Sequence, residues 1–222
     1  GKLWLGVQEQ GGLVHFDPQS GVLARYRHDP DDPSSLPDDR VESLLRRRDG
    51  SLWVGSASGL ARLREDGSFE RFRHDPQQPG SLPSNSVVGL YEDPEQTLWV
   101  GLADLGLVQR CRDCDRFEPI SLASDSPVQQ VQGRINQIMR SRDGYYWFAG
   151  MPNGLYRFDP LRQRLLRYSH DPDDPASLSH DSVLVMVEDR SGRLWLGTQG
   201  GGLVEVERNE RGEPVRFRAI GR

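Results

Sequence analysis

The sequence predicts an all-β fold built from one repeated four-stranded unit, and three observations lead to this prediction. A Leu-Trp or Tyr-Trp pair, followed by an apolar and then a small residue, occurs five times in the 222 residues. A Gly-Leu pair follows each of these tryptophans within a few residues. The motif recurs about every 48 residues, which matches the roughly 40 to 50 residues of a propeller blade and exceeds the period of leucine-rich repeats. The predicted fold class is therefore a β-propeller with five repeats.

The strands of each repeat follow from four short apolar runs separated by turn signals. In the second repeat "RVESLLRR" predicts strand a, "SLWVG" strand b, "GLARLR" strand c and "SFERFR" strand d. Asp-Gly and Ser-Gly pairs between the runs allow the positive φ angles that tight hairpins need. We expect four-stranded antiparallel blades of this kind in a single domain spanning 1–222. The blade units are approximately 1–28, 39–74, 85–120, 133–169 and 181–222.

The first repeat is predicted to lack its inner strand, because only "KLWLGV", "GLVHF" and "VLARYR" are found there. The other repeats have all four runs. A ring of seven such blades needs roughly 340 residues, so we expect a segment of a larger propeller, with a five-bladed ring and an imperfect seam as the alternative. A segment has unpaired strand edges, and these favour pairing with another chain or self-association.

Two stretches resemble the two-component regulator propeller repeat. They are "NSVVGLYEDPEQTLWVGLADLGL" and "DSVLVMVEDRSGRLWLGTQGGGL", and the loops that begin His-Asp-Pro (HDP) are also typical of this family. The resemblance implies the periplasmic sensor region of a hybrid two-component histidine kinase or a diguanylate cyclase. It also implies that any kinase or cyclase activity lies outside this chain, and that other blades or signalling domains of the same parent protein are its partners. The third repeat departs from the pattern because it lacks the HDP loop, and the fourth has Ala149 where the others have glycine.

Composition and charge exclude several classes of protein. The net charge is −5 and the pI is about 5.6, with arginines interleaved among acidic residues, so no nucleic-acid partner is expected. No stretch approaches about 18 consecutive apolar residues, so we expect no membrane segment within this chain. The chain opens with "GKLWLG", which reads as a strand and not as a signal sequence, and we expect a piece of something longer.

Positions that are constant across the repeats serve what the blades share, which is packing. The tryptophans are the clearest case, and we expect each to fill a blade core. They are Trp4, Trp53, Trp99, Trp147 and Trp195. His28, His74 and His170 begin the HDP loops. Each follows an outermost strand, so the three should lie far apart and serve turn chemistry; no metal and no cofactor is predicted.

Positions that differ between repeats at equivalent places can serve one asymmetric ligand. In an up-and-down antiparallel blade, the b-to-c loops and the starts of strand a lie on one face, nearest its centre. We expect a ligand-binding face there for a small polar ligand such as an oligosaccharide; ordinary solvated loops are the alternative. The candidate residues are Gln8, Glu9, Gln10, Arg40, Ser56, Ser58, Asn85, Asp104, Arg134, Met151, Asn153, Asp181 and Gln199.

Cys111 and Cys114 form a lone "CRDC" in the c-to-d turn of the third repeat. A structural zinc site needs four ligands, and a second pair is missing. In an oxidising compartment a disulfide would close this turn; otherwise the two residues are exposed thiols.

Three classes of function remain open. The resemblance favours a non-catalytic ligand-sensing module. A propeller glycosidase or lyase would need two positioned carboxylates, but Glu9 and Asp104 belong to non-adjacent blades, so no catalytic residue is predicted. "SRDGYYW" and "DRSGRLW" are distantly similar to the Asp-box turn of sialidases, which is itself structural. The third class is an interaction scaffold that pairs through open blade edges.

Overall fold

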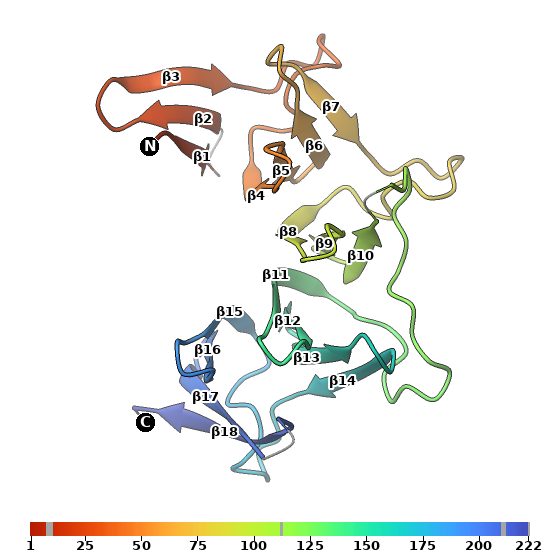
Figure 1. The fold of residues 1–222 in the computed structure, drawn as a ribbon, viewed down its shortest axis with the longest axis vertical. Helices are drawn as coiled ribbons and strands as arrows, with labels where there is room; N and C mark the ends of the chain where they lie inside the picture. The colour runs from red at the N-terminus through yellow and green to blue at the C-terminus, as the bar shows by residue number, and fades with distance from the viewer. Residues whose placement is uncertain (8–10, 112, 210–211, 222) are drawn as a thin grey trace. The chain divides into compact units, whose positions relative to one another are not determined.

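The structure, a computed structural model, describes residues 1–7, 11–111, 113–209 and 212–221, and every regular element in these residues is a β-strand (Figure 1). The strands are β1 (Leu3–Val7), β2 (Gly12–Asp17), β3 (Gly21–Tyr26), β4 (Val41–Arg46), β5 (Leu52–Ser56), β6 (Gly59–Leu63), β7 (Phe69–Phe72), β8 (Val87–Glu92), β9 (Leu98–Leu102), β10 (Leu107–Arg110), β11 (Arg134–Arg140), β12 (Tyr146–Met151), β13 (Gly154–Asp159), β14 (Arg164–Tyr168), β15 (Val183–Glu188), β16 (Leu194–Thr198), β17 (Gly202–Arg208) and β18 (Pro214–Ile220).

The strands form five sheets, here called blades 1 to 5, in which strands adjacent in the chain pair with each other (Figure 1). Blade 1 contains β1–β3, blade 2 β4–β7, blade 3 β8–β10, blade 4 β11–β14 and blade 5 β15–β18. The pairing is antiparallel, and the all-β propeller prediction is confirmed, including the three-stranded first blade. The chain divides into two compact units, 1–102 with 108–119, and 103–107 with 120–222.

The prediction of a full fourth strand in blade 3 is wrong. Within the described residues, the segment before Pro119 forms a single antiparallel bridge, between Gln109 and Glu118, and no strand. Pro119 has no N–H to donate, so the ladder cannot continue through it. Phe117 is nevertheless 7% exposed and packs in the core as the fourth strand of the other blades does.

In the first compact unit, the tryptophan of one blade packs against strand b of the next. Trp53 of blade 2 is 1% exposed and lies in one cluster with Leu98 and Val100 of β9. The glycine two residues after the tryptophan permits this close approach, because a Cβ at Gly55 would lie 2.7 Å from a methyl carbon of Val87. The constant tryptophan, and the glycine that follows it in four of the five repeats, therefore serve blade-to-blade packing.

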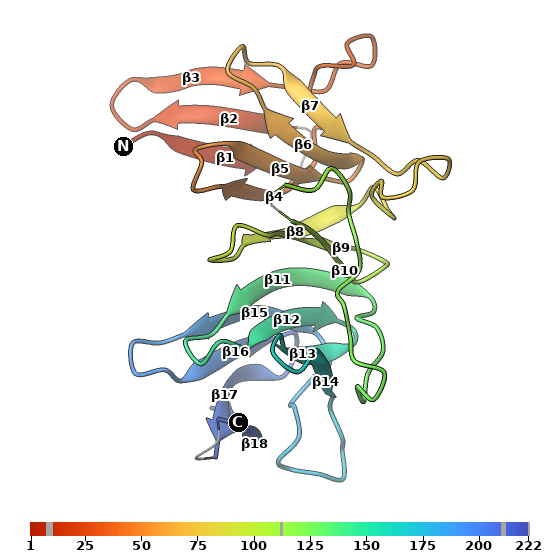
Figure 2. The ribbon, with the colours of Figure 1, turned by 45° about the vertical axis from the view of Figure 1, so that its right-hand side comes forward.

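The second compact unit repeats this arrangement with blades 4 and 5, whose sheets stack face to face (Figure 2). Trp147 is fully buried and shares a cluster with Leu194 and Leu196 of β16. Trp147 also contacts Tyr168 of its own blade, with ring centroids 6.4 Å apart, and Tyr168 contacts Phe217 of blade 5 at 5.2 Å. The core of each compact unit therefore lies between its blades.

The a-to-b turn anchors the indole of each of three tryptophans. In blades 3, 4 and 5 the residue six positions before the tryptophan accepts a hydrogen bond from the indole N–H. The pairs are Trp99 with Asp93 at 2.8 Å, Trp147 with Ser141 at 2.9 Å and Trp195 with Asp189 at 3.0 Å. A buried indole N–H needs such an acceptor, so the polar residue in the turn fixes the ring that fills the core.

The HDP loops have the same internal hydrogen bonds at three places. The histidine ring nitrogen Nδ1 lies 2.7–2.8 Å from the carbonyl oxygen of a leucine eight residues later. The pairs are His28 with Leu36, His74 with Leu82 and His170 with Leu178. The backbone N–H of each histidine donates at 2.7 Å to the side-chain oxygen of the residue eleven positions later, which is Asp39, Asn85 or Asp181. Each histidine therefore holds its own loop.

Each HDP loop also binds the outermost segment of the following blade. The carbonyl oxygen of the residue six positions after the histidine accepts a backbone hydrogen bond from a phenylalanine of that blade. The pairs are Phe69 with Ser34 at 2.6 Å, Phe117 with Gly80 at 2.7 Å and Phe217 with Ala176 at 2.8 Å. The segment between blades 3 and 4 lacks the HDP sequence and binds the outer strand β14 in another way. There, Leu165 N donates to the hydroxyl of Ser126 at 2.9 Å. A side-chain oxygen thus replaces the loop carbonyl.

Candidate functional site

Backbone hydrogen bonds join the ends of the b-to-c loops of blades 1, 3 and 4 to the start of strand a in the following blade. In the second compact unit, Gly106 N donates to Gly133 O at 3.0 Å, and Gly154 N donates to Asp181 O at 2.7 Å. Gly154 has a φ of 78°, so the tight entry into β13 requires glycine. Within blade 5, Gln199 N donates to Ser182 O at 2.9 Å, which joins the b-to-c loop to the start of strand a of its own blade. Loops and strand starts therefore form one edge of this unit, which we call the loop edge.

Six of the candidate residues lie on the loop edge of the second compact unit. They are Asp104, Arg134, Met151, Asn153, Asp181 and Gln199. Asp104 and Gln199 are exposed, and the other four are half-buried. Arg134 and Met151 are directly opposite each other in the ladder between β11 and β12, and the peptide bond from Met151 to Pro152 is cis. The structure therefore brings acidic, basic, amide and thioether groups onto one edge.

Some of these side chains also hold the fold. Asp181 Oδ1 accepts the His170 N–H at 2.7 Å, and Arg134 Nε donates to Asn136 Oδ1 at 2.6 Å. Asp181 therefore serves its HDP loop in the same way as Asn85 does in the first compact unit. A ligand on this edge would meet mainly the exposed Asp104 and Gln199.

In the first compact unit, Ser56 must be removed from the candidate ligand contacts. It is fully buried, and its hydroxyl donates to Gly59 O at 2.8 Å, so it closes the b-to-c loop from inside. Ser58 is half-buried and donates to Asp38 Oδ2 at 2.6 Å. Arg40 is exposed and pairs with Glu42 at 3.3 Å. The remaining candidates of blade 1, Gln8, Glu9 and Gln10, lie outside the described residues.

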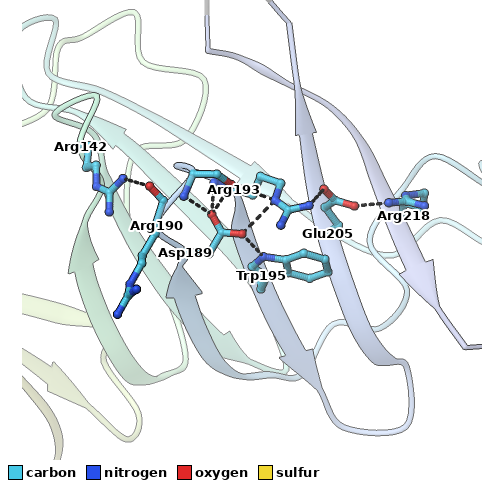
Figure 3. Close-up of polar contacts among 8 residues, drawn as sticks. Arg142, Asp189, Arg190, Arg193, Trp195, Glu205 and Arg218 are labelled. Atoms are coloured by element: carbon cyan, nitrogen blue, oxygen red, sulfur yellow. Dashed lines mark hydrogen bonds and ion pairs between the residues drawn. The ribbon is translucent and has the colours of Figure 1, made fainter.

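A polar network of the second compact unit lies at the a-to-b turn of blade 5 (Figure 3). The Asp189 carboxylate accepts hydrogen bonds from Ser191 Oγ at 2.6 Å, Trp195 Nε1 at 3.0 Å and Arg193 Nε at 2.9 Å. The Ser191 hydroxyl, followed by the indole of Trp195, holds the pKa of Asp189 well below its usual range. This carboxylate stays ionised at neutral pH and has no proton to give as a general acid.

The second carboxylate of that network is equally engaged (Figure 3). Glu205 is 8% exposed and forms an ion pair with Arg218, while Arg193 Nη1 lies 3.9 Å from its other oxygen. Glycoside hydrolysis needs one carboxyl group that is protonated and one that faces the sugar. Asp189 has no proton to give, and Glu205 is held by Arg218 and Arg193, so the network holds blade 5 together.

Sequence reasoning missed a variable position on strand c, directly opposite the core tryptophan in the ladder. It is occupied by His15 in blade 1, Arg62 in blade 2, Arg157 in blade 4 and Glu205 in blade 5. The signal was present in the sequence, because this residue always stands two positions after the leucine of the Gly-Leu pair. A position that differs this much between otherwise equal blades can give each blade its own chemistry.

Cys111 and Cys114 are joined by a disulfide that closes the c-to-d turn of blade 3. The turn holds an arginine in place, because Arg110 Nε donates to Cys114 O at 2.8 Å. The guanidinium of Arg110 lies 5.7 Å from the Trp53 ring and 5.0 Å from the Phe72 ring. The disulfide turn therefore covers the aromatic core of blade 2 with a cation.

Two kinds of feature are not found in the described residues. No three His, Cys, Asp or Glu side chains in them come together as a metal site would require. No helix in the same residues has the length and apolar character needed to cross a membrane.

Comparison with protein-family models shows three matches to the two component regulator propeller repeat, at residues 35–58, 81–104 and 177–200. Each match runs from the end of an HDP loop through strands a and b into the b-to-c loop. Comparison with curated protein sequences gave no match.

Several solved structures share the fold. One extracellular domain assigned to a hybrid two component system of B. thetaiotaomicron has a TM-score of 0.74 and 23% identity, over 94% of this chain and 26% of that chain. Another from the same organism has a TM-score of 0.78 and 18% identity, over 97% of this chain and 28% of that one. Virginiamycin B lyase from Staphylococcus aureus has a TM-score of 0.65 and 15% identity, over 100% of this chain and 67% of that chain.

The chain spans about a quarter of the length of the two-component sensor domains that it matches, since it covers 26% and 28% of them. The structural likeness shows the propeller fold, and the family model shows the repeat type. Three stretches of the chain, residues 35–58, 81–104 and 177–200, therefore match the two component regulator propeller repeat.

Proposed function

We propose that this chain is a non-catalytic ligand-sensing propeller from the extracytoplasmic, periplasmic region of a bacterial signal-transduction protein. Its ligand is a small polar molecule such as an oligosaccharide, bound on the loop edge of the second compact unit. One observation supports this proposal. Backbone hydrogen bonds from Gly106 to Gly133 and from Gly154 to Asp181 hold the backbone of the loop edge in place, whereas the side chains along this edge differ from blade to blade. A constant backbone with unlike side chains suits one asymmetric ligand.

The chemistry of the edge suits sugar hydroxyls. The Asp104 carboxylate accepts hydrogen bonds, Arg134 donates them, and the amides of Asn153 and Gln199 do both. The Met151 side chain adds a deformable apolar contact of the kind a sugar ring face can use. This mixture of donors and acceptors around one apolar side chain is typical of binding sites for small polar ligands.

The family and the solved structures support the setting of this proposal. The repeat type carries the description two component regulator propeller, and two of the similar structures are extracellular domains of two-component systems. Because these domains are about four times longer than the matched part, further blades and the output domain would be partners within the same parent protein.

The test is a glycan array probed with the labelled chain, followed by titration calorimetry with each glycan that binds. Asn153→Ala and Gln199→Ala should each weaken binding by about tenfold, since each removes a hydrogen bond to the ligand. Gln77→Ala is the control, because Gln77 is an exposed amide in an HDP loop of the first compact unit. The proposal is contradicted if no glycan binds, or if the control weakens binding as much as the two loop-edge variants do.

A second role, as a contact surface, is favoured by an apolar face on blade 5. Val185, Val187 and Leu203 are 53%, 57% and 45% exposed. The corresponding face of blade 4, which includes the buried Trp147 and Leu155, is covered by blade 5. We therefore propose that a further blade of the same repeat type covers the face of blade 5.

Light scattering tests this contact surface, because an uncovered apolar face of this kind favours association. The chain should associate in a concentration-dependent way, and Val187→Asp should restore the monomer. The outcome that would contradict the contact role is a monomeric chain whose mass and solubility are the same with and without the substitution.

A further inference from the structure

A cavity of about 590 Å³ lies in the second compact unit, at the end of blade 4 formed by its a-to-b and c-to-d turns. Its walls come from Tyr145, Arg157, Asp159, Arg162, Arg164, Leu166 and Glu213. Three of these seven residues are arginines. None of them belongs to the loop edge, which lies at the opposite ends of β12 and β13, so this cavity is separate from the proposed ligand face.

Arg157 is the buried cation of this cavity. The residue is 4% exposed, and no described residue accepts a hydrogen bond from its Nε. Its guanidinium carbon lies 3.6 Å from the Tyr145 ring centroid, and its Nη2 donates to Gly212 O at 3.4 Å. The Tyr168 hydroxyl is a further partner, and within the described residues no ion pair joins Arg157 to a carboxylate. A guanidinium keeps its charge in proteins, and burying it without a counter-charge is unfavourable.

The equivalent positions of other blades supply the counter-charge within the sheet. Arg62 pairs with Glu70, its ladder neighbour on β7, at 2.5 Å. Glu205 pairs with Arg218, its ladder neighbour on β18. The ladder neighbour of Arg157 on β14 is Leu166, which has no charge. Blade 4 therefore has a buried charge without the charged ladder neighbour that blades 2 and 5 supply, and both Arg157 and Leu166 line the cavity.

The two carboxylates in the cavity wall are engaged elsewhere. Asp159 pairs with Arg162 at 2.9 Å and accepts the N–H of Leu161 at 2.9 Å. Glu213 accepts a hydrogen bond from Asn209 Nδ2 at 3.2 Å. Arg164 is exposed, and no ion pair joins it to any residue in the described part of the chain.

We propose that this cavity binds an oxyanion, which is a carboxylate, sulfate or phosphate group, with Arg157 as its buried donor and Arg164 as its second donor. The rest of the ligand lies against the Tyr145 ring and Leu166. A planar guanidinium presents its Nε–H to an oxyanion in the favourable geometry, and the volume is in the range of small-ligand sites, roughly 300–1,000 Å³. This site is independent of the proposed sugar site on the loop edge.

The test is titration calorimetry of the whole chain at constant ionic strength with sodium sulfate, sodium phosphate, glucuronate and a sulfated disaccharide, using chloride and glucose as blanks. At least one oxyanion should bind saturably and raise the melting temperature. Arg164→Gln should weaken that binding about tenfold or more, because it removes a charged donor. Arg116→Gln, at an exposed arginine of the first compact unit, should leave it unchanged.

Arg157→Met separates a binding role from a structural one. If the cavity is an oxyanion site, this variant loses the binding yet melts no lower than the native chain without ligand, since an unpaired buried charge has been removed. Binding of inorganic sulfate or phosphate alone assigns the site to a free anion, and tighter binding of glucuronate or the sulfated disaccharide assigns it to an acidic sugar. The proposal is overturned if none of the four anions binds, or if Arg164→Gln and Arg116→Gln have equal effects.

Discussion

Trp195 donates its indole N–H to Asp189 Oδ2 at 3.0 Å, and this hydrogen bond ties the turn before β16 to the ring that covers blade 5. The same carboxylate also accepts hydrogen bonds from Ser191 and Arg193, and its ionised form is the stronger acceptor for all three. The hydrogen bonds, that of Ser191 first, lower the pKa of Asp189 in the folded protein. Folding and ionisation of this carboxylate are therefore linked.

The pH dependence of stability follows from this linkage. An unfolded aspartate has a pKa of about 3.9, and the pKa of Asp189 in the folded protein lies below it. The stabilisation is therefore fully present above about pH 5. It is lost as the pH falls through the unfolded pKa and on to the folded pKa. Asp189→Asn should melt at a lower temperature than the native chain at pH 7, with the gap closing below about pH 4. Melting curves against pH check this. Asp31→Asn, at an exposed loop position, should show no such gap.

The buried and half-buried tryptophans should differ in their contribution to stability. Trp147 is fully buried between blades 4 and 5, whereas Trp195 is only half-buried. Trp147→Ala should lower the free energy of unfolding by about 3–5 kcal/mol, and Trp195→Ala by clearly less. Urea unfolding of the two variants checks this. Equal losses would mean that the Trp195 ring is as fully packed as that of Trp147.

The connection between blade 2 and the first HDP loop depends on Arg71. Its guanidinium donates to Ser35 O at 2.7 Å and to Asp32 O at 2.8 Å. Arg71→Met keeps the aliphatic stem but removes these bonds, and should cost about 1–2 kcal/mol, the low end for charged hydrogen bonds because the side chain is partly exposed. Thermal unfolding checks this against Arg64→Met, whose side chain is exposed on the same blade. A loss no larger than that of the control would show that the loop needs no arginine.

The disulfide should act locally. It closes a very short loop, with a sequence separation of 3, so the chain-entropy gain is small, about 2 kcal/mol or less. Reduction, or the double substitution of Cys111 and Cys114 by serine, should raise amide exchange around 110–118 and leave the second compact unit unchanged. Hydrogen exchange followed by mass spectrometry checks this. Global loosening on reduction would show that the bond supports more than its own turn.

Much of the fold could be predicted from the sequence because one packing rule is repeated. The tryptophan, the glycine after it and the Gly-Leu pair each satisfy a local need, such as the 2.7 Å approach at Gly55 and the φ of 78° at Gly154. The fourth strand of blade 3 could not be predicted in the same way. "DRFEPI" reads as a strand by its alternation, but Pro119 ends the pairing after one bridge.

The candidate site was predictable only in part. Strand order places the b-to-c loops together, but it does not say which side chains turn inward, and Ser56 is buried under its own loop. The sequence alone could not show that Arg157 lacks a counter-charge, because its ladder neighbour lies on strand d, which is β14 in this blade. The ladder register that pairs Arg157 with Leu166 depends on the turn between the strands.

The central claim is that the loop edge of the second compact unit binds a polar ligand. The measurement that tests it most directly is hydrogen exchange of the chain with and without a glycan identified on the array. We predict slower exchange around 104–107, 151–154 and 197–201, with the a-to-b turns around 47–51 and 189–193 unchanged. Protection confined to those turns, or no protection at saturating glycan, would contradict the claim.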